Sequence, residues 1–190
     1  MEFTIRNARK SDAPDIARAI ITAVGEEIAM HFAGSKERRP LVDRLFNELA
    51  EAEDSQYSYR NSLVAETEDG KTAGVIVAYD GARLHELRRA FIRKAAAVLG
   101  FEIDETKMHD ETSPDEIYLD SLAVWPEYQR QGLARRLIAA AGEAHKDSEK
   151  PLGLLCEPEN LNAFALYQKL GFKKSGMRYF AGTMMHHMVK

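Results

Sequence analysis

The sequence predicts an α/β fold built on one mixed β-sheet. Apolar side chains alternate with polar ones in some segments and recur at helical spacing in others, and both patterns are spread along the whole chain. The predicted order of elements is β α α β β, an excursion, and then β α β α β β. The apolar runs at 117–124 and 152–157 are nearly continuous, which is typical of strands covered on both faces.

The N-terminal segment is predicted to hold a strand and two helices. Residues 3–8 (FTIRNA) alternate in the way a half-buried strand does. The helix that follows is expected to be capped by Ser11 or Asp12, with Pro14 tolerated in its first turn. A second helix is predicted to open at Pro40, because leucines then recur on one stripe.

The central segment is predicted to hold a hairpin and a further helix. Asp69 and Gly70 separate two β-prone runs and predict a hairpin over 61–80. A helical pattern follows over 82–100 and ends at its final glycine. We interpret 81–116 as an excursion that packs through apolar residues of its own, although its second half carries seven acidic residues against one lysine.

The C-terminal half is predicted to complete the sheet. Its expected elements are a strand at 117–124, a helix from about 133 to 146, a strand at 152–157, a helix from Asn160 to Leu170, and an antiparallel pair at 172–177 and 179–189. Asn160 is the expected cap of the second of these helices, and Gly171 is expected to end it.

Length and composition limit the classes of function. The chain has 190 residues, and we expect one domain over 1–190 with an insertion at about 81–116. A net charge of −4 argues against non-specific binding to nucleic acid. Because Cys156 is the only cysteine, an intrachain disulfide and a multi-thiolate metal site are excluded, and no metal is expected.

The sequence also predicts where the protein works. The first residues carry charges where a signal peptide needs an apolar core. No window reaches the ~18 apolar residues of a membrane span. We therefore expect a cytoplasmic protein without a membrane partner.

The stretch QRQGLARRL (129–137) has the properties of an anion-binding turn. The first amides of a helix have no intrahelical partner, and the helix dipole adds positive potential there. Gly132 and Ala134 keep the turn small, while Arg130, Arg135 and Arg136 add charge. A plain helix start with exposed arginines would look the same. Neither a P-loop motif nor a GxGxxG motif is present, so mononucleotide and Rossmann sites fit less well.

Neighbouring segments extend this pattern over about residues 117–178. Three features matter: the strand end Leu122-Ala123-Val124 followed by Pro126 and Tyr128, a Gln/Arg-x-x-Gly-x-Gly/Ala signature at Gln129, Gly132 and Ala134, and Asn160 seven residues before Tyr167, with Gly171-Phe172 after the helix. In this order and spacing the chain resembles the GNAT superfamily of N-acetyltransferases. The resemblance implies a mixed, mostly antiparallel sheet flanked by helices on both faces.

The resemblance also implies acetyl-CoA as cosubstrate. In this family the amides of the turn hold the pyrophosphate, and the preceding strand end pairs with the pantetheine arm. The residues expected to bind the cosubstrate are Leu122, Ala123, Val124, Gln129, Arg130, Gln131, Gly132, Leu133, Ala134, Arg135 and Asn160. Asn160 would look identical as a simple helix cap. Trp125 stands where relatives often have histidine, asparagine or threonine.

Tyr167 matches the tyrosine that the family uses as general acid. A phenol with a pKa near 10 holds its proton at neutral pH and can release it to a thiolate. The alternative is a core tyrosine whose hydroxyl is satisfied by a backbone group.

Asp120 is the best candidate for a general base. A carboxylate within an apolar strand is costly to bury unless it is hydrogen-bonded or paired, and burial raises its pKa. A structural aspartate, or one that positions a water or the cationic amine, is the alternative. Tyr118 and Glu116 are weaker candidates, and many relatives use a water chain instead.

Several other features are assigned structural roles. His186 and His187 point to opposite faces of a strand and cannot share one metal. Cys156 in its apolar strand is interpreted as a small core residue rather than a nucleophile. Four arginines between 83 and 93 could grip the adenosine 3′-phosphate, but a solvated helix face is the preferred reading; they are Arg83, Arg88, Arg89 and Arg93.

These observations predict transfer of acetyl from acetyl-CoA to a primary amine by direct attack in a ternary complex. The amine belongs to a small molecule or to a protein, and relatives commonly form homodimers. The acidic stretch 102–116 would attract a cationic amine, unless it is a plain solvated loop. The alternatives are a non-catalytic acyl-CoA-binding or regulatory module and an interaction domain on the same fold.

Overall fold

A computed structural model describes residues 2–190 and contains one seven-stranded sheet. The strands lie in the order β1-β2-β3-β4-β5-β7-β6, and β4 with β5 is the parallel pair among antiparallel neighbours. This confirms the mixed, mostly antiparallel sheet. The strands are β1 (Phe3–Asn7), β2 (Ser62–Thr67), β3 (Thr72–Asp80), β4 (Ile117–Val124), β5 (Leu152–Cys156), β6 (Lys173–Phe180) and β7 (Thr183–Val189).

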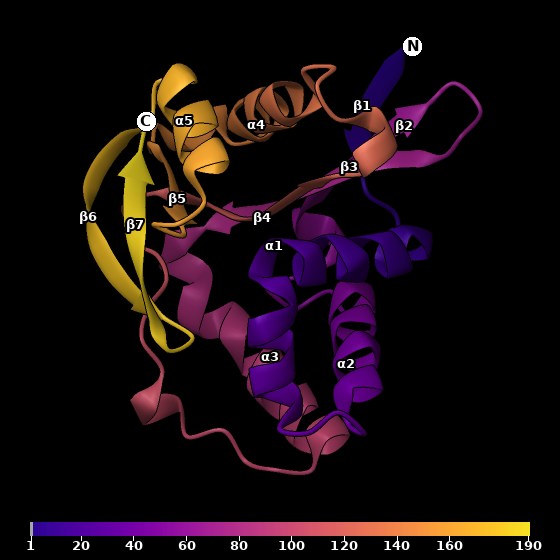
Figure 1. The fold of residues 1–190 in the computed structure, drawn as a ribbon, viewed down its shortest axis with the longest axis vertical. Helices are drawn as coiled ribbons and strands as arrows, with labels where there is room; N and C mark the ends of the chain where they lie inside the picture. The colour runs from indigo at the N-terminus through magenta and orange to yellow at the C-terminus, as the bar shows by residue number, and fades with distance from the viewer. Residues whose placement is uncertain (1) are drawn as a thin grey trace.

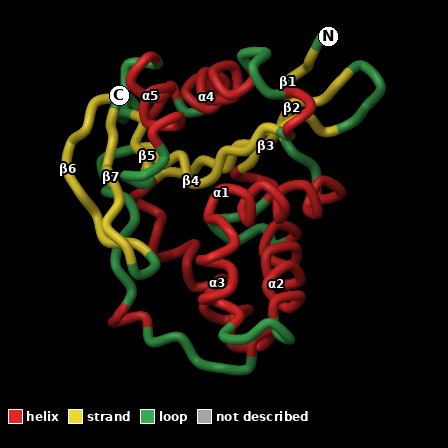
Figure 2. Tube along the Cα trace, in the orientation of Figure 1, coloured by secondary structure: helices red, strands yellow, loops and turns green. Residues whose placement is uncertain are grey.

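Helices cover both faces of the sheet (Figure 1; Figure 2). On one face lie α1 (Ala13–Ala33), α2 (Arg39–Glu51) and α3 (Leu84–Leu99), and on the other lie α4 (Leu133–Ala144) and α5 (Leu161–Lys169). Each layer has its own apolar cluster against the sheet, one built around α1, α2 and α3 and the other around α4. No helix in residues 2–190 combines the length and apolar character needed to cross a bilayer.

The first helix begins as predicted but is stabilised differently. Asp12 occupies the N-cap position and Pro14 lies in the first turn. The Asp12 carboxylate, however, accepts hydrogen bonds from the Arg9 amide at 2.6 Å and the Arg6 guanidinium at 2.7 Å, so it ties the helix start to β1. Gly25 interrupts the helix with a left-handed φ of 80° and redirects its second half.

The C-terminal hairpin turns later than predicted. The expected break near Arg178 is wrong, because β6 continues to Phe180 with an alternating pattern of exposure. The chain reverses at Ala181 and Gly182, both of which have positive φ values, 47° and 92°. Glycine adopts this geometry without strain, and the following strand then pairs back from Thr183.

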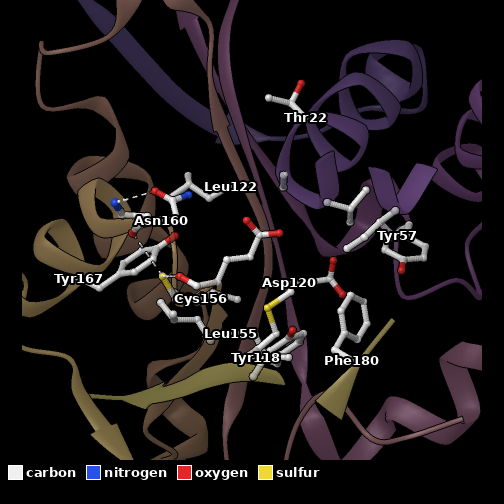
Figure 3. A pocket seen from close by; sticks show the side chains of 18 residues that line it. Thr22, Tyr57, Tyr118, Asp120, Leu122, Leu155, Cys156, Asn160, Tyr167 and Phe180 are labelled. Atoms are coloured by element: carbon white, nitrogen blue, oxygen red, sulfur yellow. Dashed lines mark hydrogen bonds between the residues drawn. The ribbon is translucent and has the colours of Figure 1, made fainter. Parts of the chain in front are cut away.

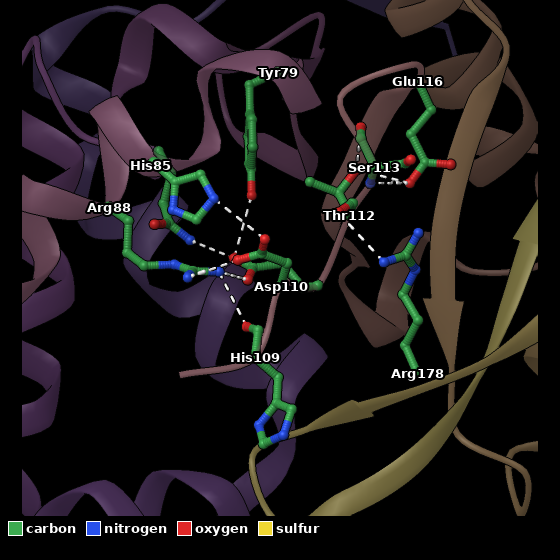
Figure 4. A network of polar contacts seen from close by, with 11 residues as sticks. Tyr79, His85, Arg88, His109, Asp110, Thr112, Ser113, Glu116 and Arg178 are labelled. Carbon is green, nitrogen blue, oxygen red and sulfur yellow. Dashed lines mark hydrogen bonds and ion pairs between the residues drawn. The ribbon is translucent and has the colours of Figure 1, made fainter. Parts of the chain in front are cut away.

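The excursion is anchored by polar contacts to buried side chains rather than solvated throughout. Arg88, expected on a solvated face, is 1% exposed; it pairs with Asp110 at 3.0 Å and with the buried Glu111 (Figure 4). At the end of the excursion the buried Glu116 pairs with His187 of β7 at 2.8 Å. These contacts hold the excursion against α3 and the C-terminal hairpin.

Candidate active site

Asp120 sits at a β-bulge in β4. Across β3 and β4, Val77 pairs with Ser121 whereas its neighbour Ala78 pairs with Leu119, which leaves Asp120 without a cross-strand partner. A bulge adds one residue to one strand and changes the face to which later side chains point. Bulges of this kind recur beside active sites, where they re-aim a side chain.

The bulge changes which side chains of β4 face the α4 side of the sheet. Leu119 before it and Leu122 after it both pack on the α4 side of the sheet, although strict alternation would place them on opposite faces. Tyr118 instead packs with Tyr79 in a separate cluster. Asp120 therefore presents a carboxylate to a cavity that its apolar neighbours Leu119 and Leu122 also line.

That cavity lies where β4 and β5 part. Their pairing ends at Leu119 and Leu154, and beyond this point the two strands diverge. The opening has a volume of about 220 Å³. Figure 3 shows Tyr167, Cys156 and Asn160 on one side of it and Asp120, Tyr57 and Phe180 on the other.

Electrostatics make Asp120 a competent base near neutral pH. Burial, followed by the negative charge of Glu111, raises the pKa of the Asp120 carboxyl to about 7. The Ser121 hydroxyl donates to the carboxylate at 2.8 Å. No lysine, arginine or histidine side chain that the structure describes forms an ion pair with it. A group with this pKa is half ionised at pH 7 and can both accept and release a proton.

Tyr167 lies where two concave surfaces meet. Its side chain lines the cavity of Asp120 and also a groove between α4 and α5. Its ring packs edge-on against Phe172, with centroids 5.8 Å apart. Burial raises the pKa of the Tyr167 phenol to about 12. Because no group in the described chain hydrogen-bonds the hydroxyl, its proton is available to a bound molecule.

The groove is formed by the predicted anion-binding turn. It has a volume of about 740 Å³, and Leu122 and Tyr167 line both the groove and the cavity. Gly132 precedes α4 with φ at 77°, and a Cβ there would meet nothing closer than the Arg135 guanidinium at 4.0 Å. The first amides of α4 therefore face open space beside a positive side chain.

The structure brings most of the predicted cosubstrate residues to this groove. Those that line it are Leu122, Val124, Gln129, Arg130, Gly132, Leu133, Ala134 and Arg135. Gln129 donates from Nε2 to the Val124 carbonyl at 3.0 Å and fixes the turn to the strand end. Ala123 packs instead in the core on the α1 side, and Gln131 is exposed outside the groove.

Two predicted residues have different surroundings from those expected. Arg136 does not add charge to the turn, because its guanidinium donates to the Phe3 carbonyl of β1 at 2.7 Å. Asn160 caps α5, accepting the Ala163 amide on Oδ1 at 3.1 Å, and it lines the Asp120 cavity rather than the groove. The predicted cap is confirmed.

Cys156 faces the cavity as well as the core. It is buried in β5, and burial, then the charge of Glu157, raises the pKa of its thiol to about 11. The thiol is therefore protonated at neutral pH, which fits its interpretation as a small apolar residue rather than a nucleophile. Glu116, the weaker base candidate, is held by His187 and Thr112 and does not line the cavity.

Sequence reasoning missed the side of the cavity formed by distant segments. Thr22 of α1, Tyr57 before β2 and Phe180 at the end of β6 all line it. Glu157, directly after β5, adds a second carboxylate at an exposed position. No local pattern distinguishes these residues, because only the packing of α1 and the hairpin brings them to β4. Among the side chains that the structure describes, no cluster of three or more His, Cys, Asp or Glu could hold a metal ion.

Comparisons with known proteins agree with this geometry. A family model described as an acetyltransferase (GNAT) domain matches residues 58–174, more than half of the chain. The ribosomal protein bS18-alanine N-acetyltransferase of Escherichia coli (strain K12) is 42% identical over 65 residues, which is 34% of this chain and 44% of that protein. The match thus spans less than half the length of this curated relative.

Two solved structures share the fold over nearly the whole chain. A crystal structure described as an acetyltransferase is 28% identical, with a TM-score of 0.75, and the match covers 98% of both chains. An N-acetyltransferase from Staphylococcus aureus Mu50 is 24% identical, with a TM-score of 0.79, over 98% of this chain and 100% of that one.

Proposed function

The chain belongs to the GNAT acetyltransferase family, and from this premise we propose that it moves an acetyl group from acetyl-CoA to a primary amine by direct attack in a ternary complex. The observation that carries the proposal is the junction at Tyr167. There a groove with the character of a phosphate site opens into a cavity whose opposite wall presents Asp120.

The residues present fit a CoA thioester. Free amides at the start of α4, the open position over Gly132, and the side chains of Arg130 and Arg135 would hold the phosphates. Beyond Leu119 the β5-facing edge of β4 has no strand partner, so its backbone groups are available to an amide-containing arm. When bound, the cosubstrate supplies an acetyl carbonyl carbon attached to a good leaving group.

Asp120 and Tyr167 divide the proton transfers between them. An alkylamine with a pKa of about 10 is mostly cationic at pH 7 and must lose a proton before it can attack. Asp120 takes one proton from the ammonium, which frees the nitrogen lone pair to attack the acetyl carbonyl carbon, and the nitrogen loses its second proton to solvent once the C–N bond has formed. Tyr167 gives its proton to the departing sulfur as the C–S bond breaks, and the phenol is then reprotonated from solvent. The two side chains lie on opposite sides of the cavity, as these two tasks require.

Two other routes fit the site less well. A covalent route through Cys156 would need a thiolate, and burial holds its proton in place. A non-catalytic acyl-CoA-binding module would need only the groove, and it would leave a carboxyl with a pKa of about 7 facing an open cavity without a task. The curated relative acts on a protein amine, so the acceptor here is a protein amine or the amine of a small molecule.

Calorimetry and a turnover assay test the proposal together. We expect acetyl-CoA to bind at one site per chain and CoA to be released when a primary amine is added. Tyr167→Phe should lower kcat roughly 100-fold or more while the affinity for acetyl-CoA stays the same, because the ring is retained and only the proton donor is lost. Full turnover by this variant under conditions where chemistry limits the rate would remove Tyr167 from the mechanism. Binding without turnover of any amine would favour the non-catalytic module.

A further inference from the structure

A second cavity adjoins that of Asp120. It has a volume of about 310 Å³, and Tyr57 and Phe180 line both cavities, so the two lie on either side of these rings. Its walls come from α1 and α3, from the excursion at 101–111, and from the turn between β6 and β7. The excursion thus contributes a wall to the acceptor side of the site.

This second cavity is mainly apolar, and its lysine and its glutamate each have an ion-pair partner. Rings and branched or thioether side chains dominate its lining; they include Phe32, Tyr57, Phe91, Phe101, Ile103 and Met108. Glu111 lies at one side, but its carboxylate is paired with the buried Arg88. Lys107 lies at another, and its ammonium pairs with Asp104 at 3.2 Å. A charged group would lose its hydration here without gaining a partner.

One buried polar atom remains unsatisfied beside the cavity. Gln56 donates from Nε2 to Glu111 at 3.1 Å, but its Oε1 is buried without a hydrogen-bond partner among the described residues. An unpaired buried acceptor is costly, and a donor carried by a bound molecule would satisfy it. Gln56 is one of the residues that line the second cavity, so this unpaired acceptor belongs to its wall.

We propose that the acceptor is a small primary amine attached to one aromatic or similarly large apolar group, and that this group fills the second cavity. The inference rests on the proposed acetyl transfer. The ammonium would reach Asp120 in the first cavity while the apolar group lies among the rings. The two cavities together match the size of a small molecule rather than a chain. A diamine fits poorly, because its second charge would lose its hydration in a cavity lined mainly by apolar side chains.

Competing acceptors at saturating acetyl-CoA test this assignment. We would measure CoA release with 2-phenylethylamine, ethylamine and 1,4-diaminobutane. The aromatic amine should have a kcat/KM roughly 10- to 200-fold above that of ethylamine, because the added apolar group binds in a matching cavity. The diamine should be no better than ethylamine.

A matched pair of substitutions locates the effect. Met108→Trp fills part of the second cavity and should lower the preference for 2-phenylethylamine over ethylamine at least tenfold. Met177→Trp makes the same change at an exposed position outside both cavities and should keep the preference. Thermal unfolding of both variants shows whether each is folded.

The outcomes separate this inference from the proposed function. Equal efficiency with all three amines, or a preference for the diamine, would overturn the inference and leave acetyl transfer intact. So would faster acetylation of a peptide with phenylalanine as its first residue than of the free aromatic amine. No turnover with any of these acceptors, despite bound acetyl-CoA, would overturn this inference, and the same result with protein amines would overturn the proposed function as well.

Discussion

At the scale of the residue, the ionisation of the Asp120 carboxyl controls the rate of acetyl transfer. Asp120 has a pKa of about 7 because it is buried near the charge of Glu111, and only its ionised form can accept a proton from the amine. We therefore expect kcat/KM to rise about tenfold per pH unit below pH 7 and to level off above it. Asp120→Asn should lose roughly 100- to 10,000-fold in kcat/KM and should also lose this inflection.

The matched control for this change is Asp115→Asn, which removes a carboxyl at an exposed position of the excursion. It should keep both the rate and the pH profile of the parent protein. An unchanged inflection near pH 7 in Asp120→Asn would assign that inflection to another group. Glu157 is the other carboxylate that lines the cavity.

The sequence could identify Asp120 but not the means by which it is presented. A charged residue within an apolar run was visible, and so was the spacing from Asn160 to Tyr167. The bulge was not visible, because the offset between Val77 and Ala78 depends on how β3 pairs with β4. Arg136 shows the same limit: its partner is a carbonyl 133 positions away, and no local pattern reveals it.

At the scale of the element, the start of α4 is the feature with the clearest test. Gly132 has a left-handed φ, which asparagine and aspartate tolerate better than other residues with side chains. Gly132→Asn and Gly132→Asp are nearly the same in shape and differ in charge. We expect the aspartate variant to bind acetyl-CoA at least tenfold more weakly than the asparagine variant, because a negative charge would face the phosphates.

Calorimetry at two salt concentrations measures this difference. The gap between the two variants should narrow at high salt, since screening weakens interactions between exposed charges. Equal affinities at low salt would mean that the phosphates bind elsewhere, and the groove between α4 and α5 would lose its assignment.

Helices, strands and the hairpin turn at Asp69 and Gly70 were predicted almost residue for residue, whereas the turn between β6 and β7 was not. The end of α3 at Gly100 and the cap at Asn160 have specific residue signals, and both are found where expected. The reversal after β6 has a weaker residue signal, because Ala181 takes a positive φ that alanine rarely adopts. The error at Arg178 follows from placing the break at a charged residue instead of at the glycine.

At the scale of the whole molecule, the sequence predicted the layers but not how the excursion is held. Alternation and helical spacing report which face of an element is buried, so the two-layered covering of the sheet could be inferred. Arg88 lies on a helix with two other arginines and was predicted to be solvated, but its partners lie in the loop 22 and 23 residues later. Pairings between distant segments leave no trace in periodicity, and here they form one wall of the second cavity.

The buried pair of Arg88 and Glu111 therefore links the excursion to the stability of the whole protein. Arg88→Met should lower the free energy of unfolding by about 3–5 kcal/mol, because it leaves the Glu111 carboxylate buried without its cation. The double variant Arg88→Met/Glu111→Gln should recover part of that loss, since it removes the stranded charge. Arg89→Met, at an exposed position on the same helix, is the matched control and should change stability little. Denaturant unfolding of these three variants and of Glu111→Gln alone completes the double-mutant cycle and its control. A double variant as unstable as the sum of the single variants would show that the two side chains stabilise the excursion independently.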